Sequence, residues 1–116
     1  MPTSEAAGFA PGDVVVVPFP YSDQLAEKRR PALVVSNDAV NAQGLVWLVM
    51  ITSATHRATA HDIPVRDLDL AGLGAPSLIR PIKIACLEPG RILRKAGRLK
   101  DTQVAEVARA IRSFIS

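Results

Sequence analysis

The 116-residue chain is short of cysteine, of aromatic residues and of long apolar runs. Cys86 is its one cysteine, which excludes an intrachain disulfide and a cysteine-rich metal site and suits a reducing cytoplasm. No apolar run approaches the length of a membrane span, and residues 1–10 lack the cationic start and apolar core of a secretory signal. We therefore expect a soluble, cytoplasmic single domain over 1–116, with residues 1–10 flexible.

Several kinds of site are also missing from the sequence. Aromatic residues make up 4% of the chain, too few for a platform on which single-stranded bases stack. Neither common glycine-rich phosphate loop is present, and no order of Ser, His and acid indicates a catalytic triad. His56 and His61 are five residues apart in a polar stretch, which misses the spacing that aims two histidines at one metal from a helix. Structural or solvent-exposed histidines, with no metal and no cofactor, are the expectation.

The amino-acid composition is typical of a small folded domain with a basic surface. Hydrophobic residues make up 48% and charged residues 22%, enough to fill one modest core. The formal net charge is +3, so a partner chosen by charge would be an anion.

Short β-branched runs bounded by turn residues predict strands. These runs cover residues 14–19, 31–36, 45–53, 63–65 and 77–88. Pro18 and Pro20 predict that the first strand lies at an edge or leaves the sheet there, and Pro81 predicts a bend or bulge in the last. The run 45–53 is the most apolar and is expected to be a central strand buried on both faces.

The remaining segments are expected to be loops, apart from two helical pieces. Residues 21–30 and 68–76 are polar or rich in turn residues and predict loops, and one helical turn is expected near 38–42. Residues 102–115 carry apolar side chains at a helical period, with Asp101 placed to cap the start. The sequence therefore predicts a mainly β fold, a compact barrel or strongly bent sheet, with one C-terminal amphipathic helix.

A candidate site combines the cation run Lys28, Arg29 and Arg30 with the hydroxyl pair Thr52 and Ser53. If the runs 31–36 and 45–53 pair as antiparallel neighbours, the start of one meets the end of the other, so Arg30 would lie beside Thr52. An arginine fork and a threonine hydroxyl both suit phosphate oxygens, and together they describe a phosphodiester site without a metal. Solvated arginines and an ordinary strand end are the alternative.

The order of these motifs resembles the MazF/PemK toxins (also Kid or CcdB-like) of type II toxin–antitoxin systems. The resemblance rests on "GDVVVVPFP" from Gly12, "RRPALVVS" up to Ser36, and an apolar strand that ends in "ITS" at Ser53. It continues through "PSLIRPIKI" and the terminal helix, and so covers about residues 11 to 115.

The resemblance implies a fold, an activity and partners. The fold is an SH3-like barrel with a C-terminal helix, and the protein is a homodimer. The activity is that of a metal-independent, sequence-specific endoribonuclease that cleaves single-stranded mRNA by attack of the 2′-hydroxyl, leaving 2′,3′-cyclic phosphate and 5′-hydroxyl ends. A cognate antitoxin occupies the RNA groove. The family's catalytic pair, the arginine before the R-P proline and the threonine of the T-S strand, matches Arg30 and Thr52.

Other positions are candidates for RNA binding, and two depart from the family pattern. Lys28, Arg29 and Ser53 would line the groove, as would Tyr21 in the loop before them. Some relatives carry a histidine in that loop and an R-x-D element in the later strand. This chain has Gln24 near the first place, and it keeps Arg80 but has Ile82 where the aspartate would fall, so the sequence does not identify the general base. Gln24 is a further RNA-binding candidate, and Arg80 is either a phosphate contact or a strand-edge cation without a role.

Two alternatives from other classes remain. One is a CcdB-like toxin that binds a protein target such as gyrase without cutting nucleic acid. The other is a non-catalytic binding module in which Arg29 and Arg30 dock an acidic partner. The R-P and T-S pair favours the ribonuclease, because a gyrase-directed protein does not need it.

Overall fold

The most apolar strand, Val46–Ser53 (β3), lies inside a curled antiparallel sheet. The computed structural model describes residues 8–19, 28–56 and 58–116. The other elements in chain order are β1 (Asp13–Phe19), β2 (Lys28–Val34), α1 (Asp38–Asn41), β4 (Ile63–Pro64), α2 (Leu68–Ala71), β5 (Ser77–Leu87), η2 (Pro89–Arg91), β6 (Arg94–Arg98) and α3 (Asp101–Ser113). All but β6, α2 and the short 3-10 helix η2 fall within or beside segments for which the sequence predicts that kind of element.

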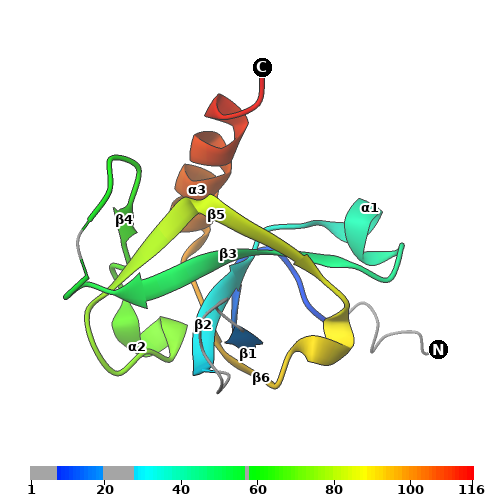
Figure 1. Ribbon diagram of the computed structural model, residues 1–116, viewed down its shortest axis with the longest axis horizontal. Helices are drawn as coiled ribbons and strands as arrows, with labels where there is room; N and C mark the ends of the chain where they lie inside the picture. The colour runs from blue at the N-terminus through cyan, green and yellow to red at the C-terminus, as the bar shows by residue number, and fades with distance from the viewer. Residues whose placement is uncertain (1–7, 20–27, 57) are drawn as a thin grey trace.

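The six strands form one sheet in the order β4-β5-β3-β2-β1-β6, and every neighbouring pair is antiparallel. Figure 1 shows the sheet curling into a half-barrel, with α3 standing at one side. This arrangement confirms the predicted mainly β, barrel-like fold with a C-terminal helix. The sequence could predict this much because β-branched runs and a single amphipathic repeat are strong local signals.

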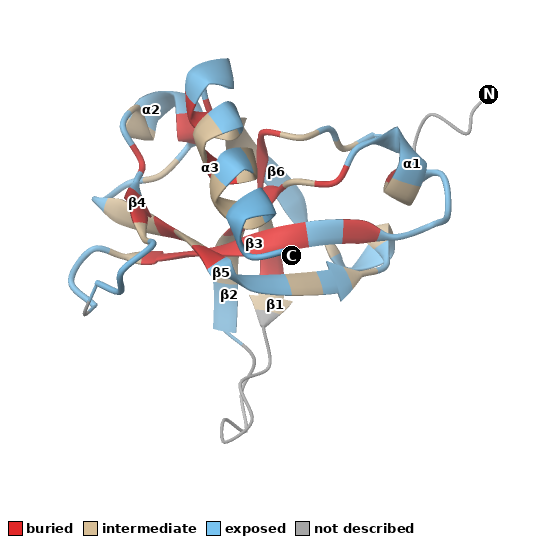
Figure 2. Ribbon diagram, turned by 90° about the horizontal axis from the view of Figure 1, so that it is seen from above, coloured by how far each residue is buried: buried red, intermediate tan, exposed pale blue. Residues whose placement is uncertain are grey.

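Both faces of the curled sheet are buried, each in a separate core. Val14 and Leu33 point into the core on the α3 side, whereas Val15 and Ala32 point into the core on the opposite side. Successive side chains of a strand alternate between the faces, so a run such as "VVVV" supplies apolar side chains to both. Figure 2 shows the buried segments of the strands beneath α3. The exception on β3 is Trp47, which is 45% exposed although the run was expected to be buried on both faces.

The strand β5 bends at the predicted place. Its pairing with β3 skips from Ile84 to Arg80 between the consecutive residues Val49 and Met50, so Pro81 lies in a bulge. Figure 1 shows that β5 bends sharply along its length. A proline is tolerated there because a bulged residue donates no ladder hydrogen bond.

Of the two alternatives for the first strand, the edge position is wrong, because β6 covers β1, whereas the strand does end beside the prolines, at Phe19. The β1–β6 ladder runs from Asp13 to Val16 and then stops, while the β1–β2 ladder continues to Phe19. Pro18 therefore lies past the end of one ladder, and its missing N–H leaves no bond unmade on that side.

The strand β6 and the helix α2 were both missed. The β6 sequence, Arg94–Arg98, carries three cations in five residues, so it has no apolar alternation to detect. The segment 68–76 was expected to be a loop, but its first residues form α2, capped by the Asp67 carboxylate, which accepts from Leu70 N. A Cβ on Gly72 would stand 2.0 Å from the Ala96 oxygen, so glycine at this position lets α2 pack closely on β6.

The terminal helix packs as its periodicity predicts, but its ends differ. Val107 is fully buried and Val104 packs against the same core. Lys100, not Asp101, is the N-cap residue, and Asp101 accepts a hydrogen bond from Arg98 instead of capping the helix. Phe114 lies past the last helical residue and is exposed.

Candidate functional site

The cation run Lys28, Arg29 and Arg30 belongs to a strand, and the prediction that these residues lie in a loop is wrong. β2 begins at Lys28, and Lys28, Arg29 and Arg30 pair with Phe19, Pro18 and Val17 of β1. Their side chains therefore alternate between the two faces of the sheet, and Arg29 points to the opposite face from its neighbours. Lys28 and Arg29 are exposed, and Arg30 is half-buried.

Arg30 and Thr52 lie together at the end of the β2–β3 ladder. The printed pairs of this antiparallel ladder end at Ala32 opposite Met50, and continuing the register by two residues brings Arg30 opposite Thr52. Opposite residues of an antiparallel pair share a face of the sheet, so both side chains are on the same face. This is the juxtaposition expected from the sequence.

Both residues line one groove. The groove has a volume of about 540 Å³ and is bounded by the start of β2, the end of β3 and the connection that leads into β5. Its lining residues are Lys28, Arg29, Arg30, Pro31, Ile51, Thr52, Ser53, His56, Leu73, Gly74, Ala75, Pro76 and Ser77. No carboxylate is among these described lining residues, so their charge is positive. We call this cavity the Arg30 groove.

The residue that sequence reasoning missed is His56. Its Nδ1 lies 2.7 Å from Thr52 Oγ1. The polypeptide turns after β3, and His56 N donates to the Ser53 carbonyl at 3.0 Å, which folds the histidine back over the strand end. The exposed His56 therefore lines the Arg30 groove beside Thr52, a residue that is only 9% exposed.

The only sequence signal for the contact between Thr52 and His56 is their short separation along the chain. Thr52 and His56 are four residues apart across a strand-to-turn junction, and no periodic pattern reveals that this turn doubles back. The other histidine, His61, makes an edge-to-face contact with Phe114 and does not line the Arg30 groove.

Ser53 also lines the Arg30 groove, with its hydroxyl engaged locally. Ser53 Oγ lies 2.8 Å from Thr55 Oγ1 and accepts from Thr55 N at 3.2 Å. Such a hydroxyl–backbone turn stabilises the chain reversal that positions His56. An RNA-binding role for Ser53 stays a prediction.

Arg80 does not join the groove. Its Nε and Nη2 donate to the two carboxylate oxygens of Asp62 at 3.1 Å and 3.0 Å, and the Asp62 side chain is 2% exposed. Burial disfavours the charged carboxylate, but hydrogen bonds from Arg80 and Thr59 outweigh that effect and hold the pKa of Asp62 below its ordinary value. The fork geometry gives Arg80 a structural partner that ties β5 to the segment before β4.

Two other predicted RNA contacts, Tyr21 and Gln24, lie outside the described residues.

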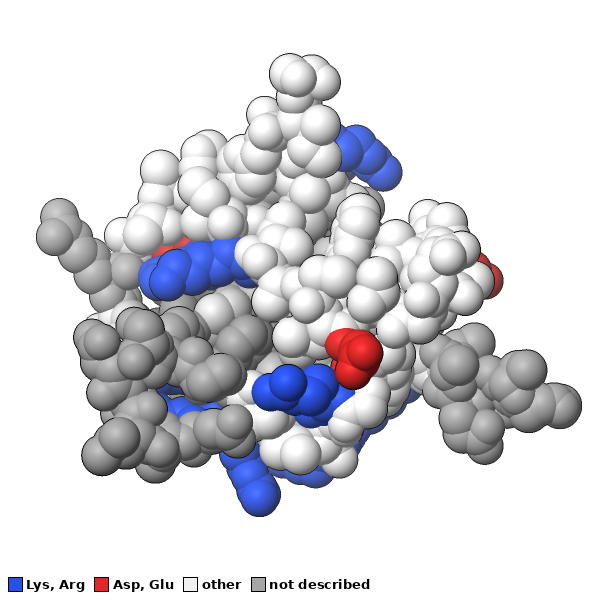
Figure 3. Space-filling model, turned by 45° about the vertical axis from the view of Figure 1, so that its right-hand side comes forward, with Lys and Arg blue, Asp and Glu red and all other residues white. Residues whose placement is uncertain are grey.

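Within the ranges that the structure describes, no three His, Cys, Asp or Glu side chains gather as a metal site requires. No helix in the same ranges is long and apolar enough to cross a bilayer. On the face drawn in Figure 3, basic side chains occupy more of the visible described surface than acidic ones.

The sequence as a whole matches a family model over residues 10–115. The model is that of the PemK-like, MazF-like toxins of type II toxin–antitoxin systems. The chain belongs to this family. The match covers β1, the R-P strand, the T-S strand and α3, so the PemK/MazF resemblance noted in the sequence is confirmed. No curated protein sequence matches the chain.

Solved MazF structures share the fold of this PemK/MazF chain. MazF from Deinococcus radiodurans superposes with a TM-score of 0.72 at 23% identity, covering 92% of this chain and 96% of that one. The toxin MazF-mt6 of Mycobacterium tuberculosis gives a TM-score of 0.67 at 22% identity, covering 87% and 93%. A mycobacterial endoribonuclease in complex with its cognate antitoxin gives 0.70 at 18% identity, covering 90% and 92%. At these identities the likeness shows the fold, which is that of MazF.

Proposed function

We propose that this PemK/MazF-family protein is a metal-independent endoribonuclease that cleaves single-stranded mRNA in the cytoplasm at specific sequences. The observation that carries the proposal is the hydrogen-bond contact between Thr52 and His56 in the groove that Arg30 lines. One cavity thus holds a fixed cation, a hydroxyl and a group able to move a proton. These are the functions that transesterification of RNA requires. A structurally similar mycobacterial protein is an endoribonuclease, which agrees with the proposal.

His56 is the proposed general base. In the tautomer with Nδ1 protonated, Nδ1–H donates to Thr52 Oγ1, which leaves Nε2 as the basic atom of an exposed imidazole. Nε2 takes the proton of the ribose 2′-hydroxyl while the 2′-oxygen bonds to the adjacent phosphorus. The bond from phosphorus to the 5′-oxygen breaks, and the leaving oxygen takes a proton from water in the open groove. The products are a 2′,3′-cyclic phosphate and a 5′-hydroxyl.

Thr52 and Arg30 act on the phosphate. With Nδ1–H as its donor, the Thr52 hydroxyl keeps its own proton for a non-bridging phosphate oxygen. The Arg30 guanidinium is a planar cation with a fork of N–H donors, and it stabilises the negative charge that grows on the phosphoryl oxygens in the transition state. Its half-buried position beside the end of β3 strengthens that attraction relative to a fully solvated cation.

The deciding experiment incubates purified protein with a mixed RNA in EDTA and maps the 5′ ends. The expected result is a recurring cleavage sequence, 5′-hydroxyl ends and cyclic phosphate termini. Thr52→Ala protein, prepared identically, controls for contaminating nucleases. RNA that stays intact at a large protein excess would overturn the proposal in favour of the gyrase-binding or non-catalytic alternatives. Cleavage that needs an added divalent ion would overturn its metal-independent form.

A cognate antitoxin is the proposed protein partner. Structurally similar toxins have been solved with antitoxins, among them a MazE–MazF complex from Deinococcus radiodurans at 24% identity. We propose that the partner covers the Arg30 groove, whose described lining carries cations and no carboxylate. Its binding should therefore compete with RNA in an anisotropy assay. Simultaneous binding of both would contradict this placement.

A second copy of the chain is the proposed occupant of an apolar face on β3 and β5. Trp47 and Ile84 are 45% and 47% exposed, and the ladder makes them diagonal neighbours on one face of the sheet. Large exposed apolar neighbours of this kind favour association. Light scattering should give a dimer for the wild type and a monomer for Trp47→Glu. A wild-type monomer at high concentration would rule the homodimer out.

A further inference from the structure

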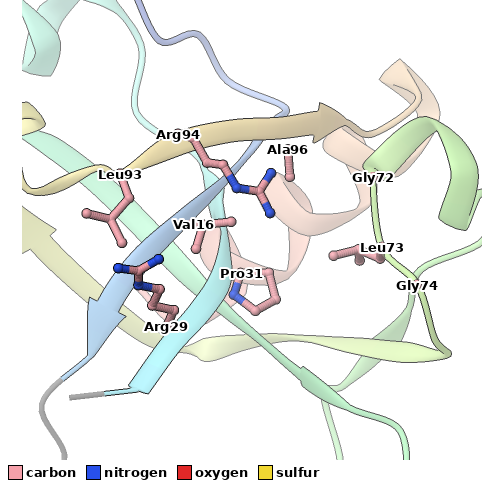
Figure 4. Close-up of a pocket in the computed structure, with 9 residues that line it drawn as sticks. All are labelled: Val16, Arg29, Pro31, Gly72, Leu73, Gly74, Leu93, Arg94 and Ala96. Atoms are coloured by element: carbon pink, nitrogen blue, oxygen red, sulfur yellow. The ribbon is translucent and has the colours of Figure 1, made fainter. Parts of the chain in front are cut away.

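A second cavity of about 550 Å³ adjoins the Arg30 groove and has no role in the chemistry proposed above. It is bounded by β1, β2, β6 and the chain that follows α2. Figure 4 shows the side chains of Arg29 from β2 and Arg94 from β6 on either side of Val16 of β1. We call it the Arg94 pocket.

The two arginines of the Arg94 pocket stay available to a ligand. Neither Arg29 nor Arg94 is in an ion pair with a described residue. The other cations of β6 behave differently, because Lys95 and Arg98 both contact the buried carboxylate of Asp13, at 3.2 Å and 3.9 Å. Arg94 is opposite Val16 in the ladder and lines the pocket instead. Two exposed guanidinium groups at one cavity suit a phosphate group.

The remaining described walls of the pocket are uncharged and mostly apolar. Leu93 is 49% exposed although it is a large aliphatic residue, and Val16, Pro31 and Leu73 are only partly buried. No carboxylate is among the described lining residues. A cavity with cations at its rim and an apolar wall suits a nucleotide, because the phosphate meets the cations and the base covers the aliphatic surface.

The Arg94 pocket is continuous with the Arg30 groove. Arg29, Pro31, Leu73 and Gly74 line both cavities. A single RNA strand whose scissile phosphate lies at Arg30 can therefore place a neighbouring nucleotide in the pocket without leaving the protein surface. Arg29, at the boundary, is positioned to contact the backbone between them.

We propose that the Arg94 pocket is a second nucleotide subsite, which binds a nucleotide next to the cleavage site on the same RNA strand. The proposal rests on the proposed ribonuclease function. Arg94 and Arg29 hold its phosphate, and Leu93 with Val16 contacts its base. The subsite lengthens the stretch of RNA that the enzyme reads beyond the two nucleotides that flank the broken bond.

The test compares Arg94→Ala with a matched control, Arg91→Ala, an exposed arginine three positions earlier that lines neither cavity. The substrates are RNAs truncated one nucleotide at a time from each end around the mapped cleavage site. Arg94→Ala should lower kcat/KM by roughly 10-fold or more on the longer RNAs, since it removes a charge-assisted contact. The loss should shrink once truncation removes the nucleotide that fills the pocket. Equal effects of Arg94→Ala and Arg91→Ala at every length would overturn the proposal.

A binding arm separates failure of the subsite from failure of the ribonuclease. Anisotropy of a labelled 2′-O-methyl RNA, which cannot be cleaved by 2′-attack, should show weaker binding by Arg94→Ala than by Arg91→Ala, and a salt slope shallower by about one. This result is expected even if the protein cuts no RNA. A failure to cleave RNA would therefore contradict the ribonuclease proposal but not the subsite proposal. If Arg94→Ala left RNA binding unchanged but weakened antitoxin binding, the subsite proposal would be overturned, and the pocket would instead be a binding site for a protein partner.

Discussion

Thr52 Oγ1 and His56 Nδ1 lie 2.7 Å apart, across the junction where the central strand ends and the chain turns back on itself. This contact places an imidazole, which can transfer a proton, beside the predicted catalytic threonine. The positions at which some relatives carry such a group hold other residues in this sequence. The loop has Gln24, and the later strand has Ile82, where some relatives carry the histidine and the aspartate. A histidine from a different segment can thus provide the missing base.

Arg30→Ala and Thr52→Ala should each abolish detectable growth arrest on expression, and should lower the cleavage rate in vitro by roughly 10²-fold or more, because each removes a donor to the reacting phosphate. The rate is measured on an RNA that carries the mapped site. Thr52→Ser keeps the hydroxyl and should retain most of the activity. Full toxicity of either alanine variant, with normal expression, would remove that residue from the site.

His56→Gln should lower the cleavage rate by roughly 10²- to 10⁴-fold, which is the usual contribution of a general base. The pH dependence gives the more specific readout. A protonated imidazole cannot accept the 2′-hydroxyl proton, so the wild-type rate should fall toward acid pH, and this fall should be missing in the variant. His61→Gln is the control, since His61 lies outside the groove against Phe114. An unchanged pH–rate profile in His56→Gln would show that His56 does not act as the base.

Lys28→Ala should weaken RNA binding to a similar extent for all sequences and reduce the dependence of log K on log salt by about one, because Lys28 contributes charge at the groove without reading bases. Anisotropy over a salt titration measures both quantities. Lys100→Ala, an exposed lysine 3.8 Å from the Asp67 carboxylate and outside the groove, is the control. A sequence-dependent loss in Lys28→Ala would mean that the lysine reads a base.

The Asp62–Arg80 pair should make folding stability depend on acid pH. Because the folded-state pKa of Asp62 is lowered, the pair stabilises the fold above the unfolded-state pKa of about 4, and this contribution is lost as the pH falls below it. Thermal melts from pH 7 to pH 3 should show a steeper decline for the wild type than for Asp62→Asn. Parallel curves would contradict the linkage. At pH 7 the variant should be less stable, because it leaves the largely buried Arg80 without its carboxylate.

Gly72→Ala should destabilise the fold by about 1 kcal/mol or more, since an added methyl group enters the positive-φ region and meets the Ala96 backbone. Gly72 has φ +74° and ends α2 as its C-cap. Gly90→Ala is the control, because a Cβ there meets nothing within 4 Å. Equal midpoints of urea unfolding for the two variants would show that the close approach of α2 and β6 is not tight in solution.

Much of the fold was readable from local sequence. The β-branched runs predicted most strands, Pro81 predicted the bulge in β5, and the apolar repeat predicted α3. The errors at β6 and at Lys28 occurred where pairing between distant segments overrides local preference, whereas the missed helix α2 is a single turn capped locally by Asp67. β6 is a strand because its backbone hydrogen-bonds to β1, and Lys28 is in a strand because it pairs with Phe19 at the end of β1.

The sequence by itself determined that Arg30 and Thr52, the residues that we propose for the phosphate chemistry, lie together, because an R-P strand followed by a T-S strand brings them opposite each other when the strands pair antiparallel. Tertiary structure alone decided which other groups join them. The turn after β3 folds His56 onto Thr52, Asp62 engages Arg80 outside the groove, and β6 brings Arg94 beside Arg29. The physical reason is that each of these contacts depends on a chain reversal or on pairing between distant segments, and neither leaves a periodic trace in the sequence.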